Sequence, residues 1–118
     1  MVYEYVPPAS GSVVQQISED HPGIDIACLR GSPIVAAHAG ELIPGYNSRM
    51  GHFAYVTHGE HSTFYAHMDS VMPPKGWVEP GEQIGTCGST GTWSMGPHLH
   101  FELWYNNNPV DPEQYILF

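Results

Sequence analysis

Short stretches of β-branched and aromatic residues, separated by turn-forming residues, follow one another along this chain. Its 13 glycines and 11 prolines are spread from end to end and leave segments of about four to nine residues, too short for most helices. The pattern therefore predicts an all-β fold, mainly of antiparallel sheets of short strands. The stretches predicted to form strands are residues 23–28, 33–37, 53–57, 63–67 and 99–104.

Turns are predicted at clusters of Gly, Pro and Asn, among them Pro44-Gly45, residues 88–91 and residues 106–109. A chain of 118 residues suits one domain, because two independent cores would each be too small to offset the entropy of ordering the chain. We therefore expect a single domain over residues 1–118, with one site on one scaffold.

The charge balance narrows the choice of partners. Twelve acidic residues against three basic ones give a formal charge of −9, which repels phosphate backbones and anionic lipid surfaces. No apolar run approaches the roughly 20 residues that span a bilayer, and the N-terminus lacks the basic and apolar regions of a signal peptide. We therefore expect no nucleic-acid partner and no membrane contact within this domain.

Four side chains suggest a common site. His98 and His100 lie two apart in a strand pattern, in which such residues project from the same face, so both imidazoles are predicted to point one way. His21 and Asp25 lie four apart, and the Pro-Gly pair between them disfavours a regular helix. An extended or bulged strand would keep both of these side chains on one face.

Two imidazoles and one carboxylate form the ligand set of a catalytic zinc site, because three protein ligands leave the fourth tetrahedral position open to water. One anionic ligand leaves the site a net positive charge, which lowers the pKa of a bound water to about 7 and polarises a carbonyl. Each pair alone is a weak signal, since an alternating strand places two histidines in this way by chance.

Four motifs in a fixed order carry a more specific signal. They are residues 21–27 (HPGIDIA), 65–68 (YAHM), 88–91 (GSTG) and 96–102 (GPHLHFE). Together they resemble the lysostaphin-type (LytM-domain) zinc metalloendopeptidases that act on peptidoglycan, and the resemblance extends over residues 20–116.

The resemblance implies that His21, Asp25 and His100 bind one Zn²⁺ per chain, and that His67 and His98 are catalytic histidines at its open side. The implied reaction is hydrolysis of a peptide bond in the cross-links or stems of peptidoglycan by a zinc-activated water. One of the two histidines would take the proton of that water, and which one serves as the base stays open.

The resemblance also has consequences for shape and location. It implies a barrel-like or sandwich-like domain with a groove lined by loops at residues 44–51 and 88–97. It implies an extracytoplasmic location (secreted, periplasmic or associated with the cell wall) as part of a longer exported protein. We expect this domain to be a monomer whose partners are peptidoglycan peptides.

One departure and two rival hypotheses accompany this interpretation. Family members commonly carry Arg or Tyr shortly before the first zinc histidine, whereas this chain has QQISED at residues 15–20; the side chain that would orient substrate there is left open. One rival is a zinc-binding but non-catalytic scaffold or activator of other cell-wall hydrolases. The other is an unrelated metal-dependent β-barrel enzyme, such as a cupin-like enzyme with iron or manganese.

Several other residues have alternative interpretations. Glu102 is either an acceptor that orients a metal ligand or a solvent-facing residue of an alternating strand. Trp93, between two glycines of a loop, is the tryptophan that could line a groove. Cys28 and Cys87 lack the spacing of a zinc knuckle, so two small, buried, inert thiols are the default, although one disulfide is possible. The remaining histidines are predicted to be surface or capped residues: His38, His52, His58 and His61.

Overall fold

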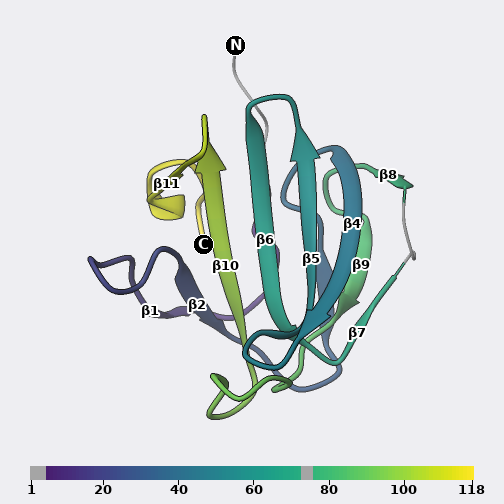
Figure 1. Ribbon diagram of the computed structural model, residues 1–118, viewed down its shortest axis with the longest axis vertical. Coiled ribbons are helices and arrows are strands. Elements are labelled where there is room, and N and C mark those ends of the chain that lie inside the picture. Colours follow the sequence, from purple (N-terminus) through teal and green to yellow (C-terminus); the bar gives the residue numbers. More distant parts are fainter. Residues whose placement is uncertain (1–4, 73–75) are drawn as a thin grey trace.

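The computed structural model describes residues 5–72 and 76–118, which form two antiparallel sheets (Figure 1). The strands are β1 (Val13–Gln15), β2 (Ile24–Ala27), β3 (Pro33–Val35), β4 (Gly40–Asn47), β5 (Gly51–His58), β6 (His61–Met68), β7 (Ser70–Val71), β8 (Gly76–Val78), β9 (Gln83–Thr86), β10 (His98–Tyr105) and β11 (Asn108–Val110), with a 3-10 turn η1 (Pro112–Gln114). The larger sheet has the order β1-β2-β10-β6-β5-β4-β8, with β11 paired to β10, and the smaller has the order β3-β9-β7. The all-β prediction is confirmed. In the described part of the chain no helix has the length and apolar character needed to cross a bilayer.

All five predicted strands are present, but the turn predicted at Pro44-Gly45 is wrong, because both residues lie within β4. Pro44 is tolerated there because β8 pairs with β4 only from Gly40 to Leu42. Beyond Leu42, β4 has a described partner on one side alone, so a residue without an N–H group breaks no ladder bond on its other side. The turn predicted after β10 is confirmed: Asn106 and Asn107 both have positive φ, as a tight hairpin requires.

Alternation along β10 separates a core face from a polar face. Leu99, Phe101 and Leu103 are almost fully buried, and the first two belong to a core that includes Ile34 of the smaller sheet and Ile84 of β9. Burying a side chain of this size contributes about 1.5–3 kcal/mol. The intervening residues of β10 therefore project from the opposite face of the larger sheet, where the histidine pair lies.

One histidine differs from its prediction. His38 is 1% exposed, donates from Nδ1 to the carbonyl of Ala39 at 2.8 Å, and has Nε2 3.0 Å from Thr63 Oγ1. Burial lowers the pKa of His38, so a neutral imidazole fills this part of the interior. His52 and His58 are exposed as predicted.

A disulfide joins the two sheets. Cys28 directly follows β2 and Cys87 directly follows β9, and the two sulfur atoms are bonded. The default prediction of two inert thiols is therefore wrong. The sequence could not reveal the pairing, because the two residues are 59 positions apart and approach only when the smaller sheet packs against the larger one.

Removing this disulfide should lower the free energy of unfolding, because the bond restricts the unfolded chain over a long loop. For a separation of 59 residues, the chain-entropy model gives about 4 kcal/mol. We expect a loss of this order for Cys28→Ala/Cys87→Ala in guanidinium unfolding. A reducing agent should destabilise the wild type by a similar amount and leave the double variant unchanged; a wild type that does not respond to reductant would contradict the bonded state.

Candidate metal centre

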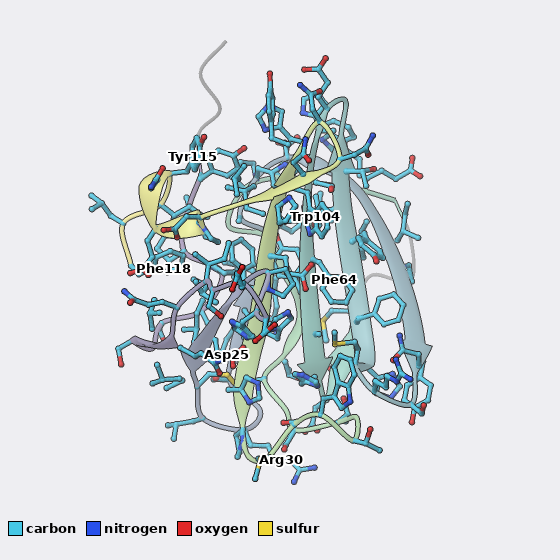
Figure 2. The ribbon with its side chains drawn as sticks, turned by 60° about the vertical axis from the view of Figure 1, so that its left-hand side comes forward. Asp25, Arg30, Phe64, Trp104, Tyr115 and Phe118 are labelled. Carbon is cyan, nitrogen blue, oxygen red and sulfur yellow. A yellow bond between two sulfur atoms is a disulfide. The ribbon has the colours of Figure 1, made fainter. Side chains whose placement is uncertain are left out.

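The centre of the site is the carboxylate of Asp25 on β2. Strand β10 pairs with β2 so that His100 lies opposite Asp25 and His98 lies opposite Ala27. Asp25 Oδ1 is 3.0 Å from His100 Nδ1 and 3.7 Å from His98 Nε2. The two histidines thus project from one face, as the alternation predicts, and Figure 2 shows Asp25 beside β10.

His21 reaches the same carboxylate from a turn, not from a strand. Its backbone forms an isolated bridge with Ser18, in which each N–H donates to the other's carbonyl. An extended or bulged strand was predicted to carry both His21 and Asp25; Asp25 lies on such a strand, and His21 does not. His21 Nε2 nevertheless lies 3.4 Å from Asp25 Oδ1.

His67 faces the site because the strand that carries it is bulged. Tyr65 and Met68 both belong to the core, although they are three residues apart and regular alternation would place them on opposite faces. The register between β5 and β6 shifts at this point, and His67 has a φ of 64°. A bulge of this kind redirects one side chain. The His67 ring centroid lies 5.0 Å from that of His98.

Each of the four histidines has one ring nitrogen engaged outside the centre. Three of them direct Nδ1 to a backbone carbonyl: His21 to Gln16 at 3.3 Å, His67 to Thr90 at 2.8 Å and His98 to Gly96 at 2.9 Å. Donation from Nδ1–H in these bonds leaves Nε2 as the lone-pair nitrogen. His100 is reversed, with Nε2 2.7 Å from Glu102 Oε2, so its Nδ1 faces Asp25.

This arrangement decides between the two interpretations of Glu102. The residue is 7% exposed and contacts His100 through one oxygen, while its other oxygen accepts a 2.7 Å hydrogen bond from Trp104 Nε1. Glu102 is therefore an acceptor that orients His100, not a solvent-facing residue. Metal-binding histidines usually have such a partner, which fixes the tautomer and the ring orientation.

The charges of the site reinforce one another. Burial alone would raise the pKa of Asp25, yet the hydrogen bond from His100 and the nearby imidazoles hold that pKa below its ordinary value. Burial alone would lower the pKa of His100, but hydrogen bonds to Asp25 and Glu102 raise it to about 9. His67 has no such carboxylate contact, and burial lowers its pKa. Without a metal, His100 carries a proton at neutral pH.

The donor atoms fit a zinc ion. His21, Asp25 and His100 each offer one ligand atom, and these atoms lie within 4.8 Å of one another. Bonds of 2.0–2.1 Å in a tetrahedron require ligand atoms about 3.3 Å apart. The distances from Asp25 Oδ1, 3.4 Å to His21 Nε2 and 3.0 Å to His100 Nδ1, are close to that separation. Two imidazoles with one carboxylate are also a donor set that suits zinc.

The site opens into a hollow of about 230 Å³. Its walls include Gln15, Met50 and Trp93 beside the five predicted site residues. Gln15 belongs to residues 15–20, the segment in which the sequence did not reveal a substrate-orienting side chain. Nothing in the sequence around Gln15 distinguishes it from its neighbours. Thr90 was also missed as a contributor. A turn was predicted at residues 88–91, whereas the turn of this loop lies at Thr92 and Trp93. The Thr90 carbonyl orients His67, a contact that only the folded chain reveals.

Comparison with known proteins identifies the family. Residues 19–112 match the model of "Peptidase family M23". The DD-carboxypeptidase/endopeptidase Mpg of Neisseria meningitidis serogroup B is 39% identical over 94 residues, which cover 78% of this chain and 22% of Mpg. The murein hydrolase activator NlpD of Salmonella dublin is 33% identical over 116 residues, which cover 92% of this chain and 30% of NlpD. The chain thus spans less than a third of either relative.

Solved structures agree with this result. A zinc-containing peptidase from Vibrio cholerae superposes with a TM-score of 0.85 at 27% identity, covering 94% of this chain and 39% of that one. The catalytic domain of the antimicrobial peptidase lysostaphin from Staphylococcus simulans gives a TM-score of 0.74 at 29% identity, covering 96% and 88%. Because the family model matches most of the chain and the fold agrees throughout, the chain belongs to peptidase family M23, the family of lysostaphin-type peptidases.

Proposed function

We propose that this chain is a zinc metalloendopeptidase that hydrolyses peptide bonds in the cross-links or stems of peptidoglycan. The observation that carries the proposal is the convergence of His21, Asp25 and His100 on one point, with two further imidazoles beside them. Relatives named as peptidoglycan endopeptidases, such as ShyB of Vibrio cholerae, support the substrate class.

The roles of the residues follow from their free nitrogens. Zinc held by His21, Asp25 and His100 would supply a Lewis acid that activates water and polarises the peptide carbonyl. His67 and His98 each keep Nδ1 on a carbonyl, so Nε2 of either can accept the proton of the attacking water. The resulting imidazolium returns that proton to the amine that leaves. Burial favours neutral His67, the form that a general base requires.

We also propose an extracytoplasmic location and a monomeric domain within a longer exported protein. The disulfide between Cys28 and Cys87 suits an oxidising compartment. Relatives named as lipoproteins, such as YgeR of Escherichia coli, which is 35% identical over 116 residues, point the same way.

A second candidate function is activation of another cell-wall hydrolase. The similarity to NlpD, which is named a murein hydrolase activator, favours it. The five intact site residues favour catalysis instead, since an activator acting by contact needs no metal ligands. The hypothesis of an unrelated, cupin-like enzyme is wrong, because the chain belongs to family M23.

Peptide cleavage should depend on zinc and on His21, His67 and His98. We expect His21→Ala to lose zinc and activity together, and His67→Ala and His98→Ala to keep zinc while kcat/KM falls about 10²–10⁴-fold, the usual contribution of general acid–base catalysis. The measurement is release of new termini from purified peptidoglycan, identified by mass spectrometry, with and without chelator. His58→Ala, an exposed histidine at the end of β5, is the matched control and should retain activity.

Both directly cross-linked and glycine-bridged walls should be tested. The activator function replaces the peptidase if zinc-loaded wild type cleaves neither wall, and if wild type and His98→Ala stimulate a separate murein hydrolase equally.

Zinc affinity should depend on pH and on Glu102. Zinc must displace the proton from His100, whose pKa is raised to about 9, so apparent affinity should rise from pH 7 to pH 9 by roughly tenfold per unit. At pH 9 we expect Glu102→Gln to weaken binding about 10–100-fold, because His100 loses its orienting acceptor. The loss should shrink towards pH 7, because the variant also lowers the pKa of His100 and relieves competition from protons.

Competition with a chromogenic chelator measures both effects. Glu41→Gln, an exposed glutamate on β4, should behave as wild type at every pH. Equal zinc affinity of Glu102→Gln and wild type at pH 9 would show that Glu102 does not support the metal.

A further inference from the structure

Two loops beside the metal centre hold a stacked cation. Arg49 lies in the loop between β4 and β5, and Trp93 lies in the loop between β9 and β10. The guanidinium carbon of Arg49 lies 5.2 Å from the ring centroid of Trp93, and hydrogen bonds join the backbones of the two loops. Trp93 N–H donates to the Arg49 carbonyl at 3.1 Å, and Thr92 N–H donates to the Ser48 carbonyl at 2.8 Å. The cation and its aromatic support are thus placed by main-chain contacts, although both side chains are exposed.

Further contacts tie the Arg49 loop to the site. Asn47 Oδ1 accepts from the backbone N–H groups of Arg49 and Met50 at 3.0 and 2.7 Å. The Met50 carbonyl in turn accepts from His67 N–H at 2.8 Å. Gly91 has a φ of +90°, and a Cβ there would collide with the Arg49 carbonyl. The hydrogen bond between Met50 and His67 therefore links the backbone next to Arg49 to that of His67.

Trp93 stands where three hollows meet. One hollow contains the metal centre, one lies towards Met95 and Pro97, and one is lined by residues 47–50 together with Trp93. The predicted loop walls at residues 44–51 and 88–97 both contribute to these hollows. A peptide lying across the metal centre in this groove would reach Arg49 at one end.

The electrostatic setting makes Arg49 unusual in this chain. The protein has three basic residues and a formal charge of −9; Arg30 is paired with Asp69, and Lys75 lies outside the described residues. Within the described ranges no carboxylate forms an ion pair with Arg49. A guanidinium that lies over Trp93 and has no described carboxylate partner, beside the proposed metal centre, matches a carboxylate ligand.

We propose that Arg49, supported by Trp93, is a specificity-determining residue that binds a free carboxylate of the substrate peptide. The inference rests on the proposed function, and it names the preferred substrate as an acidic peptide, not an uncharged glycine bridge. An exposed arginine on a loop is often merely solvated. Here the backbone bonds place the Arg49 main chain, and the contact with Trp93 directs the guanidinium to the hollow beside the metal centre.

Binding measured without turnover tests this proposal. The protein is zinc-loaded His98→Ala, and the probes are a cross-linked peptide dimer released from purified peptidoglycan and the same dimer with its carboxylates amidated. By calorimetry we expect amidation to weaken binding roughly 10–100-fold, as loss of a charge-assisted hydrogen-bonded pair implies. Adding Arg49→Gln should weaken binding of the free acid equally and abolish the difference between the two probes.

Two further variants complete the test. Arg49→Lys should recover part of the affinity, because it keeps the charge without the fork, whereas Arg30→Gln removes one cation elsewhere and should change nothing. Equal affinity for both probes, an Arg49→Gln variant that binds like its parent, or no measurable binding of either probe would overturn the proposal. Failure of the wild type to cleave the dimer, with Arg49-dependent binding intact, would instead count against the proposed peptidase function.

Discussion

The hydrogen bonds on the outer nitrogens of four histidines are the constraint on which this site depends. Without them each imidazole could rotate or change tautomer, and the nitrogen turned towards the centre would no longer be the one that can bind a metal or accept a proton. Three of the acceptors are backbone carbonyls and the fourth is Glu102, which is itself held by Trp104. The chemistry of the centre is therefore set by the course of the backbone around it.

The fold supplies that backbone through long-range contacts. The register of β2 against β10 sets Asp25 opposite His100, and the bulge in β6 turns His67 out of the core. The disulfide that follows β2 and β9 holds the smaller sheet beneath the strands that carry the site. The β4–β5 and β9–β10 loops are joined to each other at Arg49 and Trp93. The strands that carry the metal centre therefore also position the loops beside it.

Much of this was predictable from the sequence where the signal is local. Alternation predicted the strands and placed His98 and His100 on one face, and four ordered motifs identified the family. Local pattern failed where a distant segment decides the outcome. Pro44 reads as a turn but lies on a strand that has one partner at that point; His38 reads as a surface residue but is buried against β6. His67 faces the site because of a bulge in β6, and no residue near it in the sequence predicts a bulge.

The central claim is that His21, Asp25 and His100 hold a zinc ion and leave His67 and His98 free. Anomalous diffraction at the zinc edge from crystals of the zinc-loaded protein tests it most directly. We predict one peak per chain, bonded at about 2.0–2.1 Å to His21 Nε2, Asp25 Oδ1 and His100 Nδ1. A peak bonded to His67 or His98 in place of one of these atoms, or bonded through His100 Nε2, would contradict the account.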